Sequence, residues 1–292
     1  MTATNSRSHS LWSLGGLSWR EVARRVWIAS NSDDIYNRAY ELAYNFLMAI
    51  FPLLLFLMAL FGMFAGQGIK LRYDLFRYLH EIIPPLAYDL LQRTVSEVIE
   101  RSGGGKLTFG LLFALYAGST GTTQLMYILN IVYQVRETRS WIKIRLISLA
   151  LTLLIAMLIL AALFLVLAGG YLLEFLRHEF VLSLIVVQAG KIVQWIVAII
   201  FVVTTYAMVF NVGPDRKGHP WHWISPGSVI GVAIWLAASG VLRLYLHFIT
   251  SYSKSYGSLG AVIILLLWFH VTGLAFLIGA EFNSVIEHAS AQ

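Results

Sequence analysis

Long apolar runs separated by polar segments dominate the chain. The last run, from Ser258 to Ala280, contains no Lys, Arg, Asp or Glu. A helix needs about 20 apolar residues to cross the hydrocarbon core of a bilayer, so this run is long enough to span a membrane. Earlier runs of similar character predict an all-α, polytopic membrane protein built as a six-transmembrane-helix bundle. The expected spans are residues 42–65, 107–133, 146–171, 192–210, 224–248 and 258–280.

The segment before the first span is predicted to begin with a disordered tail, residues 1–17. Ser18, with Glu21 three residues later, resembles a capping box and marks the start of a helix. That helix carries arginines and tryptophans, a pattern that suits an anionic membrane surface or, equally, packing against the rest of the protein. Residues 18–287 are expected to form a single transmembrane domain.

A long polar connection, residues 66–106, separates the first two spans. Its leucines and isoleucines keep helical spacing, and Pro84-Pro85 divides it into two amphipathic segments. The pattern predicts an amphipathic helical loop outside the membrane, lying against the bilayer or capping the bundle. Pro52 lies inside the first span, where a proline usually kinks the helix.

Composition agrees with a membrane protein. The chain of 292 residues is 58% hydrophobic and only 12% charged, whereas a soluble domain is about 25% charged. The absence of cysteine excludes disulfides and thiolate ligands for a metal. The net charge of +6 is typical of basic cytoplasmic loops. We therefore expect membrane lipids, and no nucleic acid, as partners, and the basic loop at residues 136–145 predicts that both termini are cytoplasmic.

Polar side chains form a stripe along one face of the second span. They are spaced by three and four residues, which is the helical period. The stripe consists of Tyr116, Thr120, Thr123, Tyr127 and Asn130. Lipid cannot satisfy such groups, so they are expected to face the bundle interior. They either line a wet cavity or join helices through hydrogen bonds, and their size favours the cavity.

The fifth span adds Ser239, Arg243 and His247, each four residues from the next, as further candidate cavity-lining residues. A charge within a span is usually paired or in water. Arg243 lies near the end of its span, however, where it also fits snorkelling to the lipid headgroups. After the sixth span, Glu281 either pairs with an arginine of a cytoplasmic loop or is a solvated helix end.

Catalytic patterns are scarce in the sequence. His219 and His222 are close together but lack the accompanying carboxylates of a metallohydrolase site. The chain has no phosphate-binding glycine loop and no sequence signature of a Ser-His-Asp triad. No catalytic residue, metal ligand or cofactor is therefore predicted, and the chain is not expected to be an enzyme.

Several short motifs occur in a characteristic order from about Trp19 to Glu287. Ala43-Tyr44-Asn45-Phe46 precedes Phe51-Pro52, and Tyr256-Gly257-Ser258-Leu259-Gly260 precedes Gly279-Ala280-Glu281-Phe282-Asn283. Together they resemble the YihY/BrkB family of bacterial inner-membrane proteins, once labelled ribonuclease BN. The motif residues are Pro52, Tyr252, Tyr256, Gly257, Gly260, Trp268, Gly279, Glu281 and Asn283. We interpret Gly257 as part of a tight turn and Gly260 as a close helix contact.

The resemblance implies a six-span protein of the inner membrane and supplies no established mechanism. The histidine–aspartate cluster that the ribonuclease label requires is absent from the sequence. Our leading hypothesis is a transporter or translocation pathway for a lipid, glycolipid or other amphipathic solute. The alternative is a non-catalytic scaffold for envelope assembly, acting as a homo-oligomer or with an envelope partner protein.

Overall fold

The computed structural model describes residues 11–64, 104–180, 184–218, 220–248 and 251–290. Within these residues the fold is helical and contains no strand. A 3-10 helix, η1, precedes the α-helices. The elements are η1 (Leu11–Gly16), α1 (Trp19–Ser32), α2 (Ile35–Phe64), α5 (Gly104–Val132), α6 (Trp141–Phe180), α7 (Leu184–Val212), α8 (Pro226–Phe248) and α9 (Ser251–Ser290).

The predicted all-α membrane fold is confirmed, whereas the count of six spans stays a prediction. Among the described residues, four helices contain segments long and apolar enough to cross a membrane. These segments are Trp141–Ala162, Ile185–Val212, Pro226–Tyr245 and Val262–Ser290. The expected spans 42–65 and 107–133 coincide largely with α2 and α5.

The helices are longer than the apolar runs that predicted them. The sixth span was predicted at residues 258–280, but α9 begins at Ser251 and ends at Ser290. Hydropathy marks the part of a helix that suits the bilayer core, and the helix continues into polar residues at both ends. Gly257 consequently lies inside α9, so its assignment to a tight turn is wrong. The helix α2 likewise runs without interruption through Pro52.

Two other predictions concern segments outside the bundle. Most of the amphipathic loop 66–106 lies outside the described residues, and residues 104–106 form the first turn of α5. The disordered tail 1–17 was wrong for its second half, because residues 11–16 form η1. The reason is burial: Leu11 and Leu14 pack with two valines of α1 against Ile286 of α9. The prediction rested on the polar composition of the segment and took no account of these two leucines.

Helix α1 has the predicted cap and packs on the protein. The Ser18 hydroxyl accepts a hydrogen bond from the Glu21 backbone N–H at 3.3 Å. Val22 and Val26 are buried against η1 and α9, while Trp27 remains 73% exposed. Helix α1 therefore packs against the rest of the protein through its valines, which is one of the two predicted alternatives. Its Trp27 side chain stays exposed.

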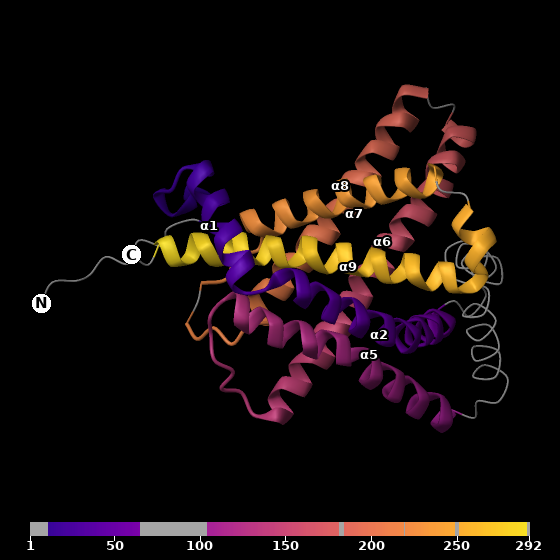
Figure 1. The fold of residues 1–292 in the computed structure, drawn as a ribbon. Coiled ribbons are helices and arrows are strands. Elements are labelled where there is room, and N and C mark those ends of the chain that lie inside the picture. The colour runs from indigo at the N-terminus through magenta and orange to yellow at the C-terminus, as the bar shows by residue number, and fades with distance from the viewer. Residues whose placement is uncertain (1–10, 65–103, 181–183, 219, 249–250, 291–292) are drawn as a thin grey trace, which may run out of the picture.

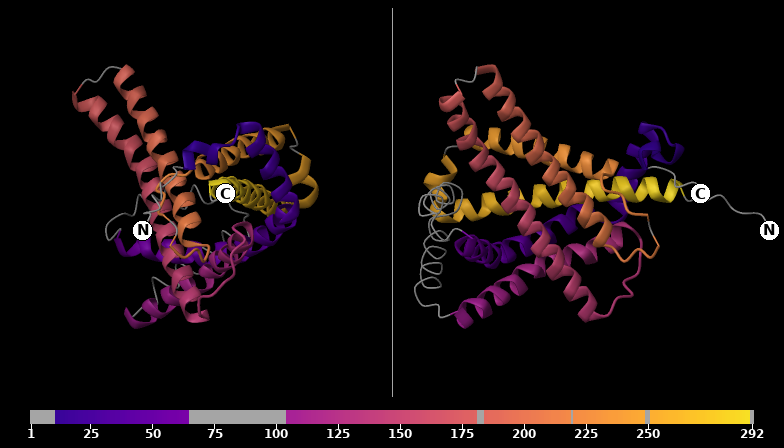
Figure 2. Two further views of the ribbon diagram at one scale, coloured as in Figure 1. Left: turned by 90° about the vertical axis from the view of Figure 1, so that its left-hand side faces the viewer. Right: turned by 180° about the vertical axis from the view of Figure 1, so that it is seen from behind.

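Helix α9 is the axis of the fold. It runs through the length of the bundle, with α2 and α8 along it, and α1 and η1 pack against its C-terminal part (Figure 1). Helix α5 packs against α2 and α6. The pair α6–α7 crosses the other helices obliquely and extends beyond them, as the two views of Figure 2 show.

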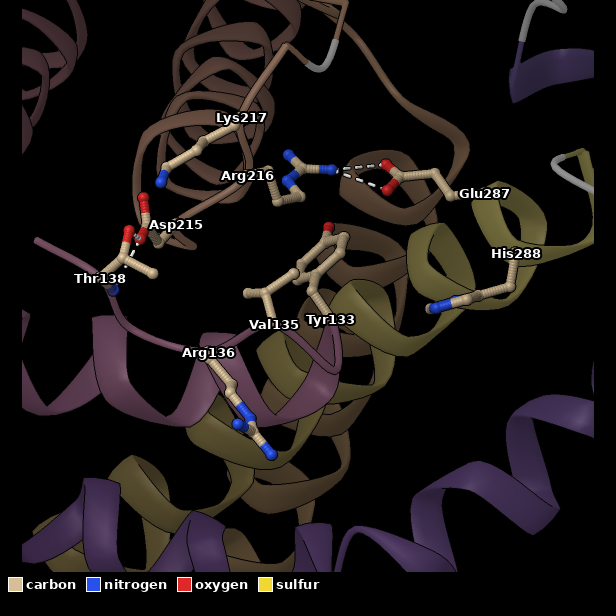
Figure 3. A pocket seen from close by; sticks show the side chains of 9 residues that line it. All are labelled: Tyr133, Val135, Arg136, Thr138, Asp215, Arg216, Lys217, Glu287 and His288. Carbon is tan, nitrogen blue, oxygen red and sulfur yellow. Dashed lines mark hydrogen bonds and ion pairs between the residues drawn. The ribbon is translucent and has the colours of Figure 1, made fainter.

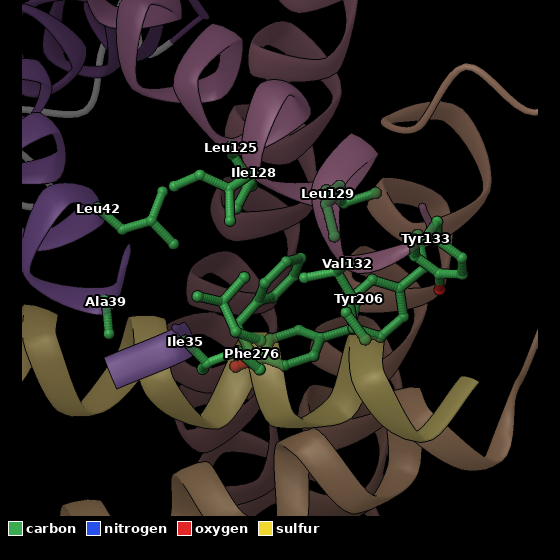
Figure 4. Close-up of a cluster of buried hydrophobic side chains, with 14 of the residues drawn as sticks. Ile35, Ala39, Leu42, Leu125, Ile128, Leu129, Val132, Tyr133, Tyr206 and Phe276 are labelled. Atoms are coloured by element: carbon green, nitrogen blue, oxygen red, sulfur yellow. The ribbon is translucent and has the colours of Figure 1, made fainter. Parts of the chain in front are cut away.

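The largest hydrophobic cluster lies where five helices meet (Figure 4). It is built from apolar faces of α2, α5, α7, α8 and α9, and most of its side chains are almost completely buried. Its aromatic centre consists of Tyr206, Phe210 and Phe276, whose ring centroids lie 4.7–5.9 Å apart. The cluster holds these helices together next to the polar end described below.

Helices α8 and α9 approach each other backbone to backbone. A Cβ atom added to Gly227 would overlap the carbonyl oxygen of Gly279, and one added to Gly279 would lie 2.6 Å from the carbonyl oxygen of Gly227. Glycine at both positions therefore allows a contact that any side chain would prevent. Asn283 fixes the register, because its Oδ1 accepts from the Gly227 N–H at 2.9 Å and its Nδ2 donates to the Ser225 hydroxyl at 2.8 Å.

Candidate functional site

Polar chemistry gathers at one end of the bundle, which we call the loop end. It is formed by the loops 133–140 and 213–225 and by the C-terminal part of α9, on the same side as α1 in Figure 1. A pocket of about 540 Å³ opens there (Figure 3). Its lining residues are Tyr133, Val135, Arg136, Thr138, Asp215, Arg216, Lys217, Glu287 and His288.

An ion-pair network joins the two loops beside this pocket. The side chain of Arg139 is only 6% exposed and donates to Glu137 at 2.7 Å and to the carbonyl oxygen of Gly213 at 2.8 Å. Its Nε also lies 3.9 Å from Oδ1 of Asp215. From α5, Asn130 donates to Glu137 at 2.7 Å and accepts from the Asp215 N–H at 2.7 Å. Every member is held by at least two others, so the loops are fixed relative to α5.

Hydrogen bonds stabilise the charged forms of both acids in the network. The Arg139 guanidinium holds the pKa of Glu137 below its usual value despite partial burial. A hydrogen bond from Asn130 lowers this pKa further. For Asp215 the leading cause is Thr138, whose hydroxyl and backbone N–H both donate to Oδ2, and its pKa is also lowered. Both carboxylates are therefore charged at neutral pH, and their charge is committed to partners inside the protein.

Arg216 forms a second ion pair on the opposite wall of the pocket. Its guanidinium donates to both carboxylate oxygens of Glu287 at 2.6 and 2.8 Å, and the two side chains are 8% and 13% exposed. The guanidinium also lies 4.3 Å from the ring centroid of Tyr133. Nη1 makes both carboxylate contacts and Nη2 donates to the Phe210 carbonyl oxygen, so the stacked arginine is held in one orientation. Arg216 therefore shapes the pocket and has little freedom to bind a ligand.

Two other cations of the pocket have no such partner. Arg136 and Lys217 are exposed at its rim, and neither forms an ion pair with any residue that the structure describes. Arg136, Arg139, Arg216 and Lys217 outnumber the acids Glu137, Asp215 and Glu287 by one, and Lys217 also attracts the Asp215 carboxylate, so the rim has a small net positive charge. An anionic group is the ligand that this arrangement favours.

A separate polar site lies between α5 and α6, around Arg145. Its guanidinium carbon lies 3.7 Å from the ring centroid of Tyr116, and the same group donates to the Tyr116 carbonyl at 2.7 Å and to the Thr123 hydroxyl at 3.3 Å. A small pocket of about 60 Å³ adjoins it. The pocket is lined by Tyr116, Thr123, Tyr127, Trp141, Ile144 and Arg145.

The predicted stripe on α5 is divided between these two sites. Tyr116, Thr123 and Tyr127 line the pocket beside Arg145, whereas Asn130 is buried in the network of the loop end. Thr120 is exposed, and its hydroxyl donates to the Ala117 carbonyl within the same helix. The residues share a helix face as predicted, but they do not line one continuous pocket.

The candidates on α8 lie elsewhere. Ser239 has a buried hydroxyl without a hydrogen-bond partner among the described residues, and Arg243 is exposed. The His247 side chain lies outside the described residues. Helix α8 packs against α9 and α7, and neither of the two pockets above includes a residue of α8. The structure therefore does not bring these residues together with the α5 stripe.

The motif residues of α9 serve packing more than chemistry. Trp268 lies 6.5 Å, between ring centroids, from Trp235 of α8, and Gly260 is buried. The side chains of Tyr252 and Tyr256 lie outside the described residues. Glu281 is only 1% exposed, and its Oε1 has no hydrogen-bond partner among the described residues.

The environment of Glu281 differs from both alternatives considered for it. It interacts with the carboxyl group of Asp33, at the junction of α1 and α2, and forms no ion pair with a described arginine. It is also too deeply buried to be a solvated helix end.

Sequence reasoning missed the acids of the loop end and the position of Arg145. The cations at 136–145 had been used only to orient the chain. Glu137 and Asp215 are isolated acids in basic loops, a signal that would have suggested ion pairing. Arg145 lies one turn after Trp141, inside the helix, although hydropathy placed it before the third span.

Comparison with known proteins identifies relatives over most of the chain. A family model described as virulence factor BrkB matches residues 26–292. The protein named YfkH of Bacillus subtilis (strain 168), described as ribonuclease-like, is 28% identical over 251 residues, which cover 86% of this chain and 89% of that protein. A UPF0761 membrane protein of Psychromonas ingrahamii is 26% identical over 266 residues, covering 90% and 86%.

No solved structure matches the chain. The family match nevertheless covers nearly its whole length, the relatives include membrane proteins, and several of its helices suit a bilayer. The chain therefore belongs to the BrkB family and is a multi-pass membrane protein.

Proposed function

We propose that this protein is a translocation pathway for an anionic amphipathic molecule, such as a phospholipid or glycolipid. In this proposal the loop-end pocket receives the polar head group, and the apolar part of the molecule stays in the bilayer. The membrane setting is given by the family and the apolar helices. The movement, the class of molecule and its entry point are our inference.

The observation that carries the proposal is the charge distribution around the loop-end pocket. Its four cations outnumber its three acids, and Arg136 and Lys217 are the exposed ones, with no ion pair within 4.0 Å among the described residues. A pocket of about 540 Å³ has room for a lipid head group. Its positive rim would raise the local concentration of anionic molecules near the entrance.

The α5 stripe supplies polar groups away from that entrance. Asn130 lies beside the pocket, and Tyr127, Thr123 and Tyr116 follow it along one face of the helix. A head group moving along α5 would meet hydroxyl groups at successive turns, which would reduce the loss of its hydration. In this proposal the rigid Arg139 network keeps α5 and the loops in register during movement.

A proteoliposome assay tests this function. Fluorescent phosphatidylglycerol in the outer leaflet would be followed by its loss of signal to an impermeant quencher, with phosphatidylcholine as the uncharged comparison. We expect faster movement of phosphatidylglycerol with protein than without it, and a several-fold slower rate for the Arg136→Gln, Lys217→Gln double variant. Lys143→Gln, which removes an exposed cation outside the pocket, is the matched control. Rates equal to those of protein-free vesicles would refute the proposal.

A scaffold for envelope assembly is the second candidate, and interhelical hydrogen bonds favour it. The Thr122 hydroxyl bonds with Thr152 of α6 at 2.7 Å, and Gln124 donates to Glu41 of α2 at 2.6 Å. Polar groups on α5 thus act as contacts between helices. Specific crosslinking to a second copy or to an envelope protein, together with no lipid movement, would support this function over transport.

The proposal places the protein in the bacterial inner membrane with its loop end and both termini in the cytoplasm. The basic loops at that end support this orientation. We further propose that the protein has no enzymatic activity and binds no nucleic acid. Cysteine-accessibility labelling of Ser140→Cys, in the loop 133–140, from either side of the membrane tests the orientation, since labelling only from outside the cell would reverse it.

A further inference from the structure

Arg145 lies away from the loop end and within the part of α6 that suits a bilayer. Trp141–Ala162 is one of the apolar membrane-crossing segments, and Arg145 follows its first turn. The guanidinium extends to the carbonyl oxygen of Tyr116 on α5. Tyr116 is about 24 Å along α5 from the end of that helix at Val132, at about 1.5 Å per residue. The charge is thus displaced from the loop end toward the middle of α5.

No carboxylate among the described residues neutralises this charge. The guanidinium donates to a carbonyl and a hydroxyl, and its Nε is buried without a hydrogen-bond partner. By contrast, Arg139 and Arg216 each form an ion pair. A charged side chain inside the bilayer is unfavourable unless it is paired or hydrated, and such residues commonly mark binding sites. The described residues therefore supply no anionic partner to Arg145.

The adjoining pocket has the size and the donors for a phosphate group. Its volume is about 60 Å³, and on this measure a single water needs about 10–15 Å³. It therefore accommodates a small anionic group and excludes an entire lipid. Beside the guanidinium, its wall includes the hydroxyl groups of Tyr116 and Tyr127, which can donate to phosphate oxygens, whereas the Thr123 hydroxyl already donates to the Ser119 carbonyl oxygen at 3.0 Å.

The surroundings of the pocket are those of a lipid rather than of a soluble anion. Tyr116 and Tyr127 are 46% and 39% exposed, so the pocket reaches the outer surface of the bundle. Large apolar side chains are exposed on both helices around it. These are Leu112 and Phe113 on α5, and Ile142 and Leu146 on α6. They provide a surface for acyl chains next to the anion-binding group.

We propose that the Arg145 site binds the phosphate group of an anionic phospholipid, whose acyl chains lie along the exposed faces of α5 and α6. The guanidinium pairs with the phosphate through the Nη hydrogens that its bonds to Thr123 and Tyr116 leave over, and the tyrosine hydroxyls complete the site. This site is separate from the loop-end pocket. Its occupancy does not depend on whether the protein moves lipids.

Native mass spectrometry of the full-length protein in detergent tests the proposal. Bound phosphatidylglycerol is counted during titration, with phosphatidylcholine as the zwitterionic comparison. Arg145→Gln is expected to weaken the tightest phosphatidylglycerol binding by about 10-fold or more, because a charge-assisted contact is lost. Arg145→Lys keeps the charge and is expected to weaken it less. Lys143→Gln removes an exposed cation two residues away and is expected to bind as the wild type does.

Three results would overturn the proposal. One is unchanged phosphatidylglycerol binding in Arg145→Gln; another is an equal loss in Lys143→Gln, which would indicate a general charge effect. The third is displacement of the lipid by inorganic phosphate at equal concentration, which would indicate a soluble phosphate instead. Far-ultraviolet circular dichroism identifies a variant that fails to fold, and Arg145→Lys then decides the outcome. Failure of lipid movement in proteoliposomes would leave a positive binding result intact.

Discussion

Arginines at the loop end and Arg145 in the bundle differ in one respect, the presence of a carboxylate. Arg139 and Arg216 have similar burial, and each is paired with a glutamate at 2.6–2.7 Å. Arg145 has ring, carbonyl and hydroxyl contacts but no ion-pair partner among the described residues. The first two cations are neutralised by carboxylates within the protein, whereas no described carboxylate neutralises the third.

This difference separates charges that hold the fold from charges that are available to a ligand. Removing one partner of a buried ion pair leaves the other charge without compensation, which is strongly unfavourable. Removing a cation that has no anionic partner leaves no such charge behind. Folding stability as well as ligand binding therefore distinguishes the two kinds of arginine. The loss of stability is expected to be largest for a paired arginine and smallest for Arg145.

The largest effect is expected for Arg139→Ala. This change leaves the Glu137 carboxylate and the Gly213 carbonyl without their donor in a nearly buried setting. We expect the free energy of unfolding in detergent, measured by denaturant titration, to fall by about 3–5 kcal/mol. The control is Arg136→Ala, an exposed neighbour in the same loop, which is expected to change it by less than about 0.5 kcal/mol. Equal losses for the two variants would show that the network does not stabilise the fold.

The buried hydrogen bonds of Asn283 involve no charged group, so their removal shows whether a large loss of stability requires an ion pair. Asn283→Ala removes both hydrogen bonds that join α9 to the start of α8 and leaves the Gly227 N–H buried without an acceptor. We expect a loss of about 2 kcal/mol, because a buried unsatisfied group adds to the lost hydrogen bonds. Asn31→Ala, which removes one exposed hydrogen bond to the Trp27 carbonyl, is the control. A loss larger than that of Arg139→Ala would contradict the importance of the ion pairs.

The sequence predicted the fold more fully than the sites, and the reason is the range of the interactions. Periodicity and apolar length are local, so they located the helices and the polar face of α5. The contact between Gly227 and Asn283 joins residues 56 positions apart, and Asn130 meets Asp215 across 85 positions. A single sequence has no periodic pattern that relates residues so far apart along the chain. The motif Gly279–Asn283 was recognised, but its role became clear only through α8.

Arg145 shows how a local rule can conceal a site. A hydropathy window ends where a charge begins, so the third span was predicted to start at Leu146 and the arginine was placed in the preceding loop. Helix α6 instead begins at Trp141, and α5 brings Tyr116 and Thr123 to the guanidinium. Because α6 packs across α5 at this point, the predicted stripe lies in two different environments, whereas a single environment was predicted from the sequence.

Acidification should weaken the loop end specifically. The pKa values of Glu137 and Asp215 are lowered in the folded protein, from ordinary values of 4.5 and 3.8. Their stabilising contribution is therefore complete above about pH 5 and is lost as the pH falls through the lowered folded values. We expect unfolding midpoints to drop more steeply below pH 4.5 in the wild type than in Glu137→Gln, Asp215→Asn. Parallel pH curves would show that these two acids do not report on the network.

The smallest effect on stability is expected at Arg145, and it is the sharpest test of the comparison. Arg145→Met keeps much of the apolar volume and strands no carboxylate, while the Tyr116 carbonyl keeps the Ser119 hydroxyl as a donor. We expect the free energy of unfolding in lipid-free detergent to change by less than about 1 kcal/mol, well below the effect of Arg139→Ala. Phosphatidylglycerol should then raise the melting temperature of the wild type more than that of Arg145→Met, because a ligand stabilises the state that binds it. If Arg145→Met is instead as destabilising as Arg139→Ala, the two arginines have the same structural role, and the absence of a carboxylate does not mark a binding site.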